Sequence, residues 1–202
     1  IAIAGLGVVG AEVARQVINR GDELRVAAGT QLQVVAVSAR DRSVDRGVNL
    51  DGIDWYDEAP KLAERDDIDI IIEMIGGSEG VALDLARAAL GSGKHLISAN
   101  KAMIAHHGAE LAQLAEANDV HLLFESAVAG GIPAVKTLRE GLAGNKITRV
   151  AGILNGTCNY ILSTMETTGR DFETVLADAQ RLGYAEAKPS FDVDGIDAAH
   201  KL

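Results

Sequence analysis

The chain has 202 residues, of which 48% are hydrophobic and 24% charged, and its formal net charge is -10. This composition supports a packed core, whereas nucleic-acid binding needs a basic surface that so acidic a chain is unsuited to provide. No run approaches the roughly 18 apolar residues of a membrane span. We therefore expect a globular protein that binds neither nucleic acid nor membrane.

The chain opens with an apolar run at residues 1–4, a glycine-rich turn, and a helical pattern over residues 9–18. Gly5 permits a tight bend, Gly7 lets the backbone approach a pyrophosphate, and Gly10 lets the helix lie close to its strand. This strand-turn-helix predicts dinucleotide binding, although a tight connection that binds nothing has the same spacing. The expected cofactor contacts in the turn are Gly5, Leu6, Gly7, Val8, Val9 and Gly10.

Beyond the first helix we expect an irregular insertion at residues 22–30 and a second strand at residues 33–38. Arg40 and Asp41 follow this strand, where dinucleotide enzymes contact the adenosine ribose. An arginine pairs with the 2′-phosphate of NADP, whereas an acidic residue accepts from the ribose hydroxyls of NAD. We favour NADP, with Arg42 as a second cation; an ordinary solvated charge cluster explains the segment equally well.

Three further strands are predicted at residues 68–75, 95–98 and 120–124, with helices over about 79–90 and 104–115 between them. Alternating strands and helices at this spacing are typical of an α/β protein with a Rossmann-type doubly wound parallel sheet.

Unusual residues follow the ends of several predicted strands. Ligands of open α/β sheets bind at the carboxyl edge, so these exits should meet in one crevice. The exits contain the glycine turn, Arg40, Ile75, Gly76, Gly77, Asn100, Lys101 and Glu125. We add Ile75, Gly76 and Lys101 to the expected cofactor contacts.

The pattern changes near residue 130, which we take as the boundary between a dinucleotide-binding domain (1–130) and part of an α+β substrate and dimerisation domain (131–202). Pro133 should open a helix that runs to residue 142. The later expected elements are a strand at 146–154 and helices at 156–165 and 171–182.

The chain begins inside a strand without methionine and stops in what reads as a helix, so we expect a fragment of a longer protein. Its one cysteine, Cys158, cannot form an internal disulfide, which favours a cytoplasmic location. A helix that begins near Asp194 would place Asp197 and Lys201 on one face. Such a pair is usually a surface salt bridge, but a desolvated lysine held by a carboxylate could also transfer protons.

Five blocks of the sequence, in order, resemble homoserine dehydrogenases. They are residues 5–10, 98–101, 125–133, 154–162 and 183–201. The resemblance implies reversible NAD(P)-dependent reduction of aspartate 4-semialdehyde to homoserine, on the route to threonine, methionine and isoleucine. It also implies a homodimer or higher homo-oligomer, and a catalytic region that continues beyond residue 202.

The resemblance also implies roles for individual residues. Lys201 matches the general acid/base, Asp197 the carboxylate beside it, and Lys101 the lysine where cofactor and substrate meet. The residues that match the substrate site are Glu186 and Asp192, which would hold the ammonium group, with Thr157 and Tyr184 nearby.

A monovalent cation, usually sodium, is a further implication of the resemblance. Its ligands would be Glu125 and the backbone carbonyls of Val128, Gly130 and Ile132. Hard cations take oxygen ligands, but Glu125 could also be a buried carboxylate that caps this loop.

Two alternatives remain beside this hypothesis. One is another amino-acid dehydrogenase, such as an aspartate dehydrogenase. Another is a nucleotide-sensing module whose second half only dimerises. A thioester-forming semialdehyde dehydrogenase would need a cysteine nucleophile with a histidine base; Cys158 begins an apolar helix with no histidine nearby in sequence, so we interpret it as a packing residue.

Overall fold

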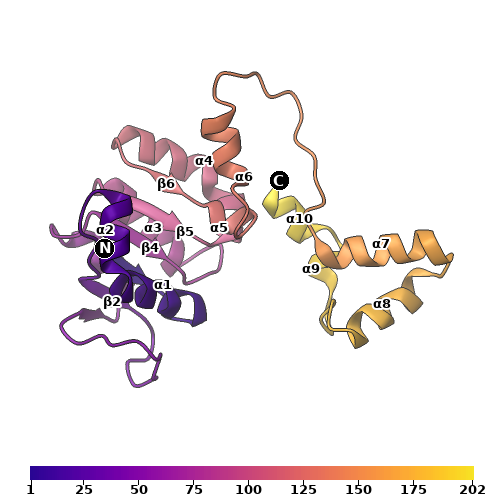
Figure 1. Cartoon of the computed structure of the whole chain (residues 1–202), viewed down its shortest axis with the longest axis horizontal. Coiled ribbons are helices and arrows are strands. Elements are labelled where there is room, and N and C mark those ends of the chain that lie inside the picture. Colours follow the sequence, from indigo (N-terminus) through magenta and orange to yellow (C-terminus); the bar gives the residue numbers. More distant parts are fainter. The chain divides into compact units, whose positions relative to one another are not determined.

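The computed structural model describes residues 1–202 and divides them into two compact units, Ile1–Val135 and Lys136–Leu202 (Figure 1). All strands belong to the first unit, whereas the second is built from helices and irregular segments. No helix in the chain combines the length and apolar character that crossing a membrane requires.

The first unit contains a six-stranded sheet in which every neighbouring pair is parallel. The spatial order is β3-β2-β1-β4-β5-β6, so the direction of winding reverses between β1 and β4. This order confirms the doubly wound sheet. The strands are β1 (Ala2–Ala4), β2 (Ala36–Ser38), β3 (Asp54–Tyr56), β4 (Ile70–Glu73), β5 (His95–Ser98) and β6 (Leu122–Leu123).

Side chains that alternate along each strand build two separate cores. In β1, Ala2 and Ala4 pack in a cluster that includes residues of α3 and α4, whereas Ile3 packs in a cluster with residues of α1. The sheet therefore has a covered face on either side, as a doubly wound fold requires. The helical elements of this unit are α1 (Val8–Asn19), α2 (Gly21–Ala28), the 3₁₀ helix η1 (Ala59–Glu64), α3 (Val81–Gly91), α4 (Lys101–Ala117), α5 (Glu125–Val128) and α6 (Ala134–Lys136), whose last residue belongs to the second unit.

Two features of the first unit differ from the sequence prediction. Residues 22–30 are mostly helical in α2, which has Asp22 and Glu23 in its first turn and ends at Gly29 in the left-handed conformation. Acidic residues complement the positive end of a helix and a left-handed glycine closes it. The short edge strand β3 was not predicted; its three residues pair in parallel with β2.

The second unit contains the π-helical segment η2 (Thr137–Gly141), α7 (Gly156–Thr168), α8 (Phe172–Arg181), α9 (Ser190–Val193) and α10 (Ile196–Lys201). Its buried apolar cluster joins α7 to α8 through Ile161, Val175 and Ala179, together with Ala185. Asn155 and Asp171 cap α7 and α8 by accepting hydrogen bonds from Cys158 N and Thr174 N.

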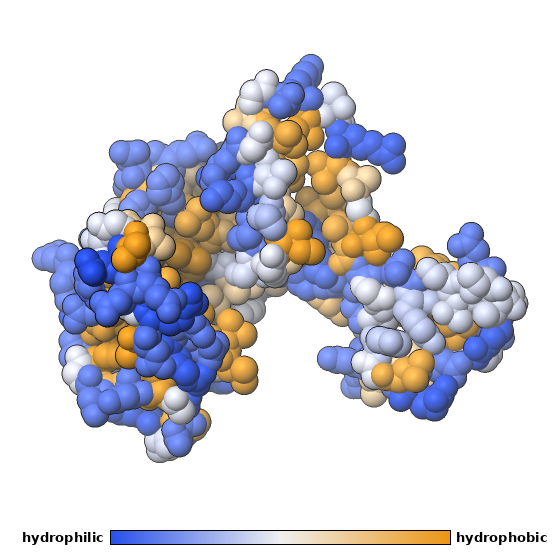
Figure 2. Space-filling view, viewed as in Figure 1, coloured by the Kyte–Doolittle hydropathy of each residue, from blue (hydrophilic) through white to orange (hydrophobic).

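The strand predicted at residues 146–154 is absent, and the segment is irregular. A strand must share its backbone hydrogen bonds with a neighbour, and no other part of the chain pairs with these residues. Ile147, Val150 and Ile153 are consequently exposed, and hydrophobic residues are visible along this segment in Figure 2. The prediction was wrong because alternation of apolar side chains does not supply a partner strand.

Candidate functional site

A pocket of about 610 Å³ lies at the carboxyl ends of β1, β2 and β4. This is the edge where the winding of the sheet reverses, and where open α/β sheets bind ligands. Its lining comprises Gly5, Leu6, Gly7, Ser38, Ala39, Arg40, Asp41, Val44, Arg46, Asp57, Ala59, Met74, Ile75, Gly76 and Val81.

The three glycines of the first turn occupy different environments. Gly5 has φ +92°, and a Cβ there would lie 2.5 Å from the Met74 carbonyl group. A Cβ on Gly10 would overlap the carbonyl oxygen of Gly5, so this glycine lets α1 lie close to β1. Gly7 has open space at its Cβ position and lines the pocket. The backbone at Gly7 is therefore accessible to a bound phosphate at the positive end of α1.

Val8 and Val9 do not line the pocket with their side chains. Val8 is 92% exposed at the first position of α1. Because the first amides of a helix have no partner inside the helix, the contribution expected from these two valines is through backbone N–H groups.

Arg40 and Asp41 both line the pocket beyond β2. The guanidinium group of Arg40 is exposed and makes no hydrogen bond or ion pair within the chain, unlike the carboxylate of Asp41. Asp41 Oδ1 accepts hydrogen bonds from Ser43 N at 2.8 Å and Ser43 Oγ at 2.7 Å. These bonds lower the pKa of the Asp41 carboxyl group. Asp41 thus closes its own turn, and Arg42 lies outside the pocket lining with its guanidinium 5.9 Å from the Trp55 ring centre.

Arg46 connects the loop after β2 to the glycine turn. Its Nε donates to Leu6 O at 3.0 Å, and its two terminal nitrogens donate to Val44 O and Asp41 O at 2.7 and 2.5 Å. The guanidinium also lies 5.3 Å from the Trp55 ring centre. Arg46 has no signal in the sequence, because its acceptors are backbone carbonyls as many as 40 positions away.

Glu73 is a second residue that sequence analysis did not assign to the site. It is fully buried at the end of β4 and accepts hydrogen bonds from Ile75 N, Gly76 N and Ser98 Oγ. The available signal was an acidic residue directly after three consecutive isoleucines, since a buried charge requires specific partners.

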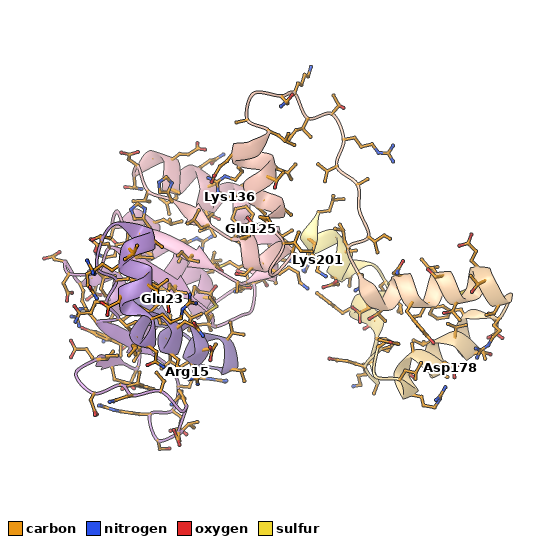
Figure 3. All side chains as sticks on the ribbon, viewed as in Figure 1. Arg15, Glu23, Glu125, Lys136, Asp178 and Lys201 are labelled. Carbon is orange, nitrogen blue, oxygen red and sulfur yellow. The ribbon has the colours of Figure 1, made fainter.

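Lys101 is the first residue of α4, and the preceding Asn100 caps this helix by accepting from Met103 N at 3.1 Å. Glu125 begins α5, and its Oε1 accepts from Val135 N at 2.9 Å (Figure 3). The Glu125 carboxylate therefore closes the loop that contains Gly130 and Ile132. No group of three or more His, Cys, Asp or Glu side chains is arranged to hold a metal ion.

In the second unit, Lys201 lies on α10 (Figure 3). Two acceptors hold its side chain. Its ammonium group donates to Asp197 Oδ2 at 2.7 Å and to Leu154 O at 2.7 Å. Asp197 is only 7% exposed. An ammonium group has three N–H donors, so one remains for a further acceptor.

Asn155 joins the two aspartates of this cluster. Its Nδ2 donates to Asp192 Oδ1 at 2.8 Å and to Asp197 Oδ2 at 2.9 Å, while its Oδ1 caps α7. Asn155 is 8% exposed, and its amide orients both carboxylates, of which Asp197 is buried and Asp192 half-buried. Asn followed by Gly before a helical pattern indicates a helix cap. This pattern does not indicate the contacts that Asn155 makes with the two distant aspartates.

Cys158 donates its S–H to Asp192 O at 3.1 Å. Burial raises the pKa of this thiol, and the carboxylates of Asp192 and Asp197 raise it further. A nucleophilic cysteine needs the opposite shift, so the geometry favours a packing role.

The other expected substrate residues lie around the start of α7 and the loop before α9. Thr157 Oγ1 donates to Tyr184 O at 2.7 Å, and the Tyr184 ring lies 4.8 Å from that of Tyr160. Glu186 is exposed, and its backbone carbonyl accepts from Gln180. The structure thus brings Lys201, Asp197 and Asp192 together through Asn155. Lys101 belongs to the other unit, and its expected position where cofactor and substrate meet remains a prediction.

Comparison with known proteins assigns both units to one family. The family model described as "Homoserine dehydrogenase, NAD binding domain" matches residues 5–125, and the model described as "Homoserine dehydrogenase" matches residues 133–202. The chain belongs to the homoserine dehydrogenase family. The resemblance identified from the five sequence blocks is thereby confirmed.

Two curated homoserine dehydrogenases illustrate the similarity. The chain is 49% identical to the homoserine dehydrogenase of Corynebacterium glutamicum over 202 residues, and 46% identical to that of Pseudomonas aeruginosa over 204 residues. Both alignments include the whole chain but only 45% and 46% of the relatives. The chain therefore spans about half the length of the homoserine dehydrogenases it matches.

Solved structures give the same result. A homoserine dehydrogenase from Thiobacillus denitrificans matches 99% of this chain and 46% of its own, with a TM-score of 0.83 and 43% identity. A hyperthermophilic archaeal homoserine dehydrogenase in complex with NADPH matches 99% of this chain and 66% of its own, with a TM-score of 0.79 and 28% identity. The NADPH of the archaeal relative and the match of residues 5–125 to an NAD binding domain both support a nicotinamide cofactor.

Proposed function

We propose that the protein containing this chain is a homoserine dehydrogenase that interconverts L-aspartate 4-semialdehyde and L-homoserine with NADP(H). This reaction lies on the route to threonine, methionine and isoleucine. The observation that carries the proposal is the pair of Lys201 and buried Asp197, because it provides an oriented proton donor in a family that carries out hydride transfer.

Lys201 is proposed as the general acid in the reductive direction. When bound, the nicotinamide cofactor would supply the hydride for the aldehyde carbon. Lys201 gives a proton to the aldehyde oxygen, and in reverse its neutral amine removes the proton from the homoserine hydroxyl group. Asp197 and the Leu154 carbonyl occupy two of the three donors of the ammonium group, which leaves the third for the substrate oxygen.

The substrate is an amino acid, so its ammonium group needs carboxylates. We assign this role to Asp192 and Glu186, with Thr157 and Tyr184 beside them. Asn155 holds Oδ1 of Asp192 and leaves Oδ2 as an acceptor. Lys101 is assigned to the meeting point of cofactor and substrate, where its charge would favour the developing alkoxide.

We favour NADP over NAD because Arg40 and Asp41 differ in their existing bonds. Asp41 already accepts two hydrogen bonds from Ser43, whereas Arg40 lines the pocket with its cationic group exposed. A guanidinium group is suited to bind the 2′-phosphate that distinguishes NADP.

A monovalent cation such as sodium is proposed at the loop after β6. The donors would be Glu125 and the carbonyls of Val128, Gly130 and Ile132, and hard oxygen donors suit such an ion. The loop fits because Glu125 Oε1 already closes it through Val135 N, and Gly130 has φ +60°. We expect sodium chloride to raise the thermal midpoint more than choline chloride does, and the difference to vanish in Glu125→Ala.

Two further proposals concern the intact protein. The family resemblance supports a homodimer or higher homo-oligomer, and the single free Cys158 suits the reducing cytoplasm.

The experiment that tests the function is a steady-state assay of the full-length protein with L-homoserine and NADP. We expect NADPH to form, with no comparable rate from L-aspartate. Turnover of aspartate would support an aspartate dehydrogenase instead. NADP binding without turnover of either amino acid would show a nucleotide-sensing module.

A further inference from the structure

Glu73 is a carboxylate with no access to solvent, at the point where β4 leaves the sheet. Its Oε1 accepts from Ile75 N at 2.7 Å and from Gly76 N at 3.1 Å, and its Oε2 accepts from Ser98 Oγ at 2.5 Å. Removing an ionised carboxylate from water is costly unless such partners replace its hydration. A strand that needed only a core residue would be served better by another isoleucine.

The groups that Glu73 binds belong to the wall of the cofactor pocket. Ile75 and Gly76 line that pocket, and the next residue, Gly77, shares with Gly76 a φ of +86°. Because glycine has wide conformational freedom, few local interactions hold these two residues in place. The carboxylate of Glu73 fixes this segment from inside the protein by orienting two consecutive backbone amides.

The same network continues to the start of α4. Ser98 Oγ accepts from Asn100 N at 3.0 Å, and Asn100 Nδ2 donates to Gly77 O at 2.7 Å. Asn100 also caps α4, whose first residue is Lys101. One chain of hydrogen bonds therefore links the pocket wall to the backbone that carries Lys101.

We infer that Glu73 is a positioning residue for the nicotinamide cofactor. Its hydrogen bonds fix the pocket wall at Ile75 and Gly76 relative to the start of α4, which carries Lys101. This inference rests on the proposed function, since it requires the pocket to bind NADP. Glu73 touches neither cofactor nor substrate in this role. It acts through the backbone of its neighbours.

The test uses Glu73→Gln in the full-length protein. A glutamine retains the shape and one acceptor oxygen, but it removes the charge that orients the two amides and leaves the Ser98 hydroxyl hydrogen without its acceptor. We expect the Kd for NADP, measured by fluorescence titration, to rise by roughly tenfold, as loss of one charge-assisted hydrogen bond predicts. The kcat for homoserine at saturating NADP should also fall.

The matched control is Lys94→Met, which replaces a buried charge outside the pocket. Lys94 is 7% exposed and donates to Arg65 O and Ile68 O. We expect Lys94→Met to lower the thermal midpoint while the Kd for NADP stays within about twofold of wild type. A twofold change in Kd is smaller than the loss of one hydrogen bond would cause. An unchanged Kd in Glu73→Gln, or a Kd raised equally in Lys94→Met, would overturn the inference.

Ser98→Ala provides a second test if Glu73→Gln does not fold. It removes one of the three donors to Glu73, and we expect a smaller rise of the Kd in the same direction; an unchanged Kd would count against the inference. Binding by the wild-type protein distinguishes failure of the proposed function from failure of the role of Glu73. Wild type that fails to bind NADP would refute the proposed function, whereas normal binding by wild type and both variants would refute only the role of Glu73.

Discussion

Arg40 and Asp41 are neighbours at the exit of β2, yet the structure gives them different tasks. Asp41 folds back on Ser43, and these hydrogen bonds lower its pKa and keep it ionised. Arg40 instead lines the pocket with its charge available. Sequence alone placed both residues at the ribose but could not show which of them was already engaged.

Arg40→Ala should weaken NADP binding by about 10- to 100-fold and leave NAD binding nearly unchanged, because a charge-assisted hydrogen bond contributes about 1.5–3 kcal/mol. Isothermal titration with each cofactor measures the ratio. Arg20→Ala is the control, since Arg20 lies at the end of α1 and pairs with Glu23. An unchanged preference for NADP in Arg40→Ala would remove the argument for a phosphate site at this residue.

At the scale of elements, α1 depends on two glycines that serve different purposes. Gly10 allows close packing on the glycine turn, whereas Gly7 faces open space in the pocket. Stability and cofactor binding should therefore be separable within a single turn.

Gly10→Ala should lower the thermal midpoint by several degrees or prevent folding, because overpacking costs about 1–3 kcal/mol or more. Gly7→Ala should fold with a midpoint close to wild type but bind NADP more weakly, since its methyl group projects toward the phosphate site. Differential scanning calorimetry and cofactor titration on both variants distinguish the two effects. Equal loss of stability in both would contradict this division of roles.

The second unit should show a pH dependence at the start of α8. Asp171 accepts from Thr174 N and Oγ1, and its backbone bond to Thr174 is the main cause of its lowered pKa. A carboxyl group whose pKa is lowered by folding stabilises the folded state above its unfolded pKa, near 4, and this contribution is lost as the pH falls through the folded value. The midpoint difference between wild type and Asp171→Ala should thus be large at pH 7 and shrink toward pH 3. A difference independent of pH would refute the assignment.

Most of the elements that sequence predicted have local signals, although α2 was missed despite its acidic first turn and terminal glycine. The turn at Gly5, Gly7 and Gly10 depends on residues within one strand-turn-helix, and the parallel order follows from alternating elements. By contrast, Glu73 binds the distant Ser98, and Asn155 binds Asp192 and Asp197, so these contacts exist only after folding. The prediction of a strand at 146–154 was wrong for a related reason. Strand pairing depends on a partner segment elsewhere in the chain.

At the scale of the whole molecule, the chain carries two parts of one proposed reaction. The first unit contains the complete pocket lining at the sheet edge, and the second contains Lys201 with its carboxylate. The family assignment extends across both units. We therefore expect that cofactor binding and proton transfer can be impaired separately.

The most direct test is Lys201→Ala in the full-length protein, assayed with homoserine and NADP. Loss of a general acid/base should lower kcat by roughly 10²- to 10⁴-fold while the Kd for NADP stays near its wild-type value. Lys146→Ala, which alters an exposed lysine of the same unit, should leave both quantities unchanged. Wild-type turnover in Lys201→Ala, or an equal loss of turnover and NADP binding, would contradict the role assigned to Lys201.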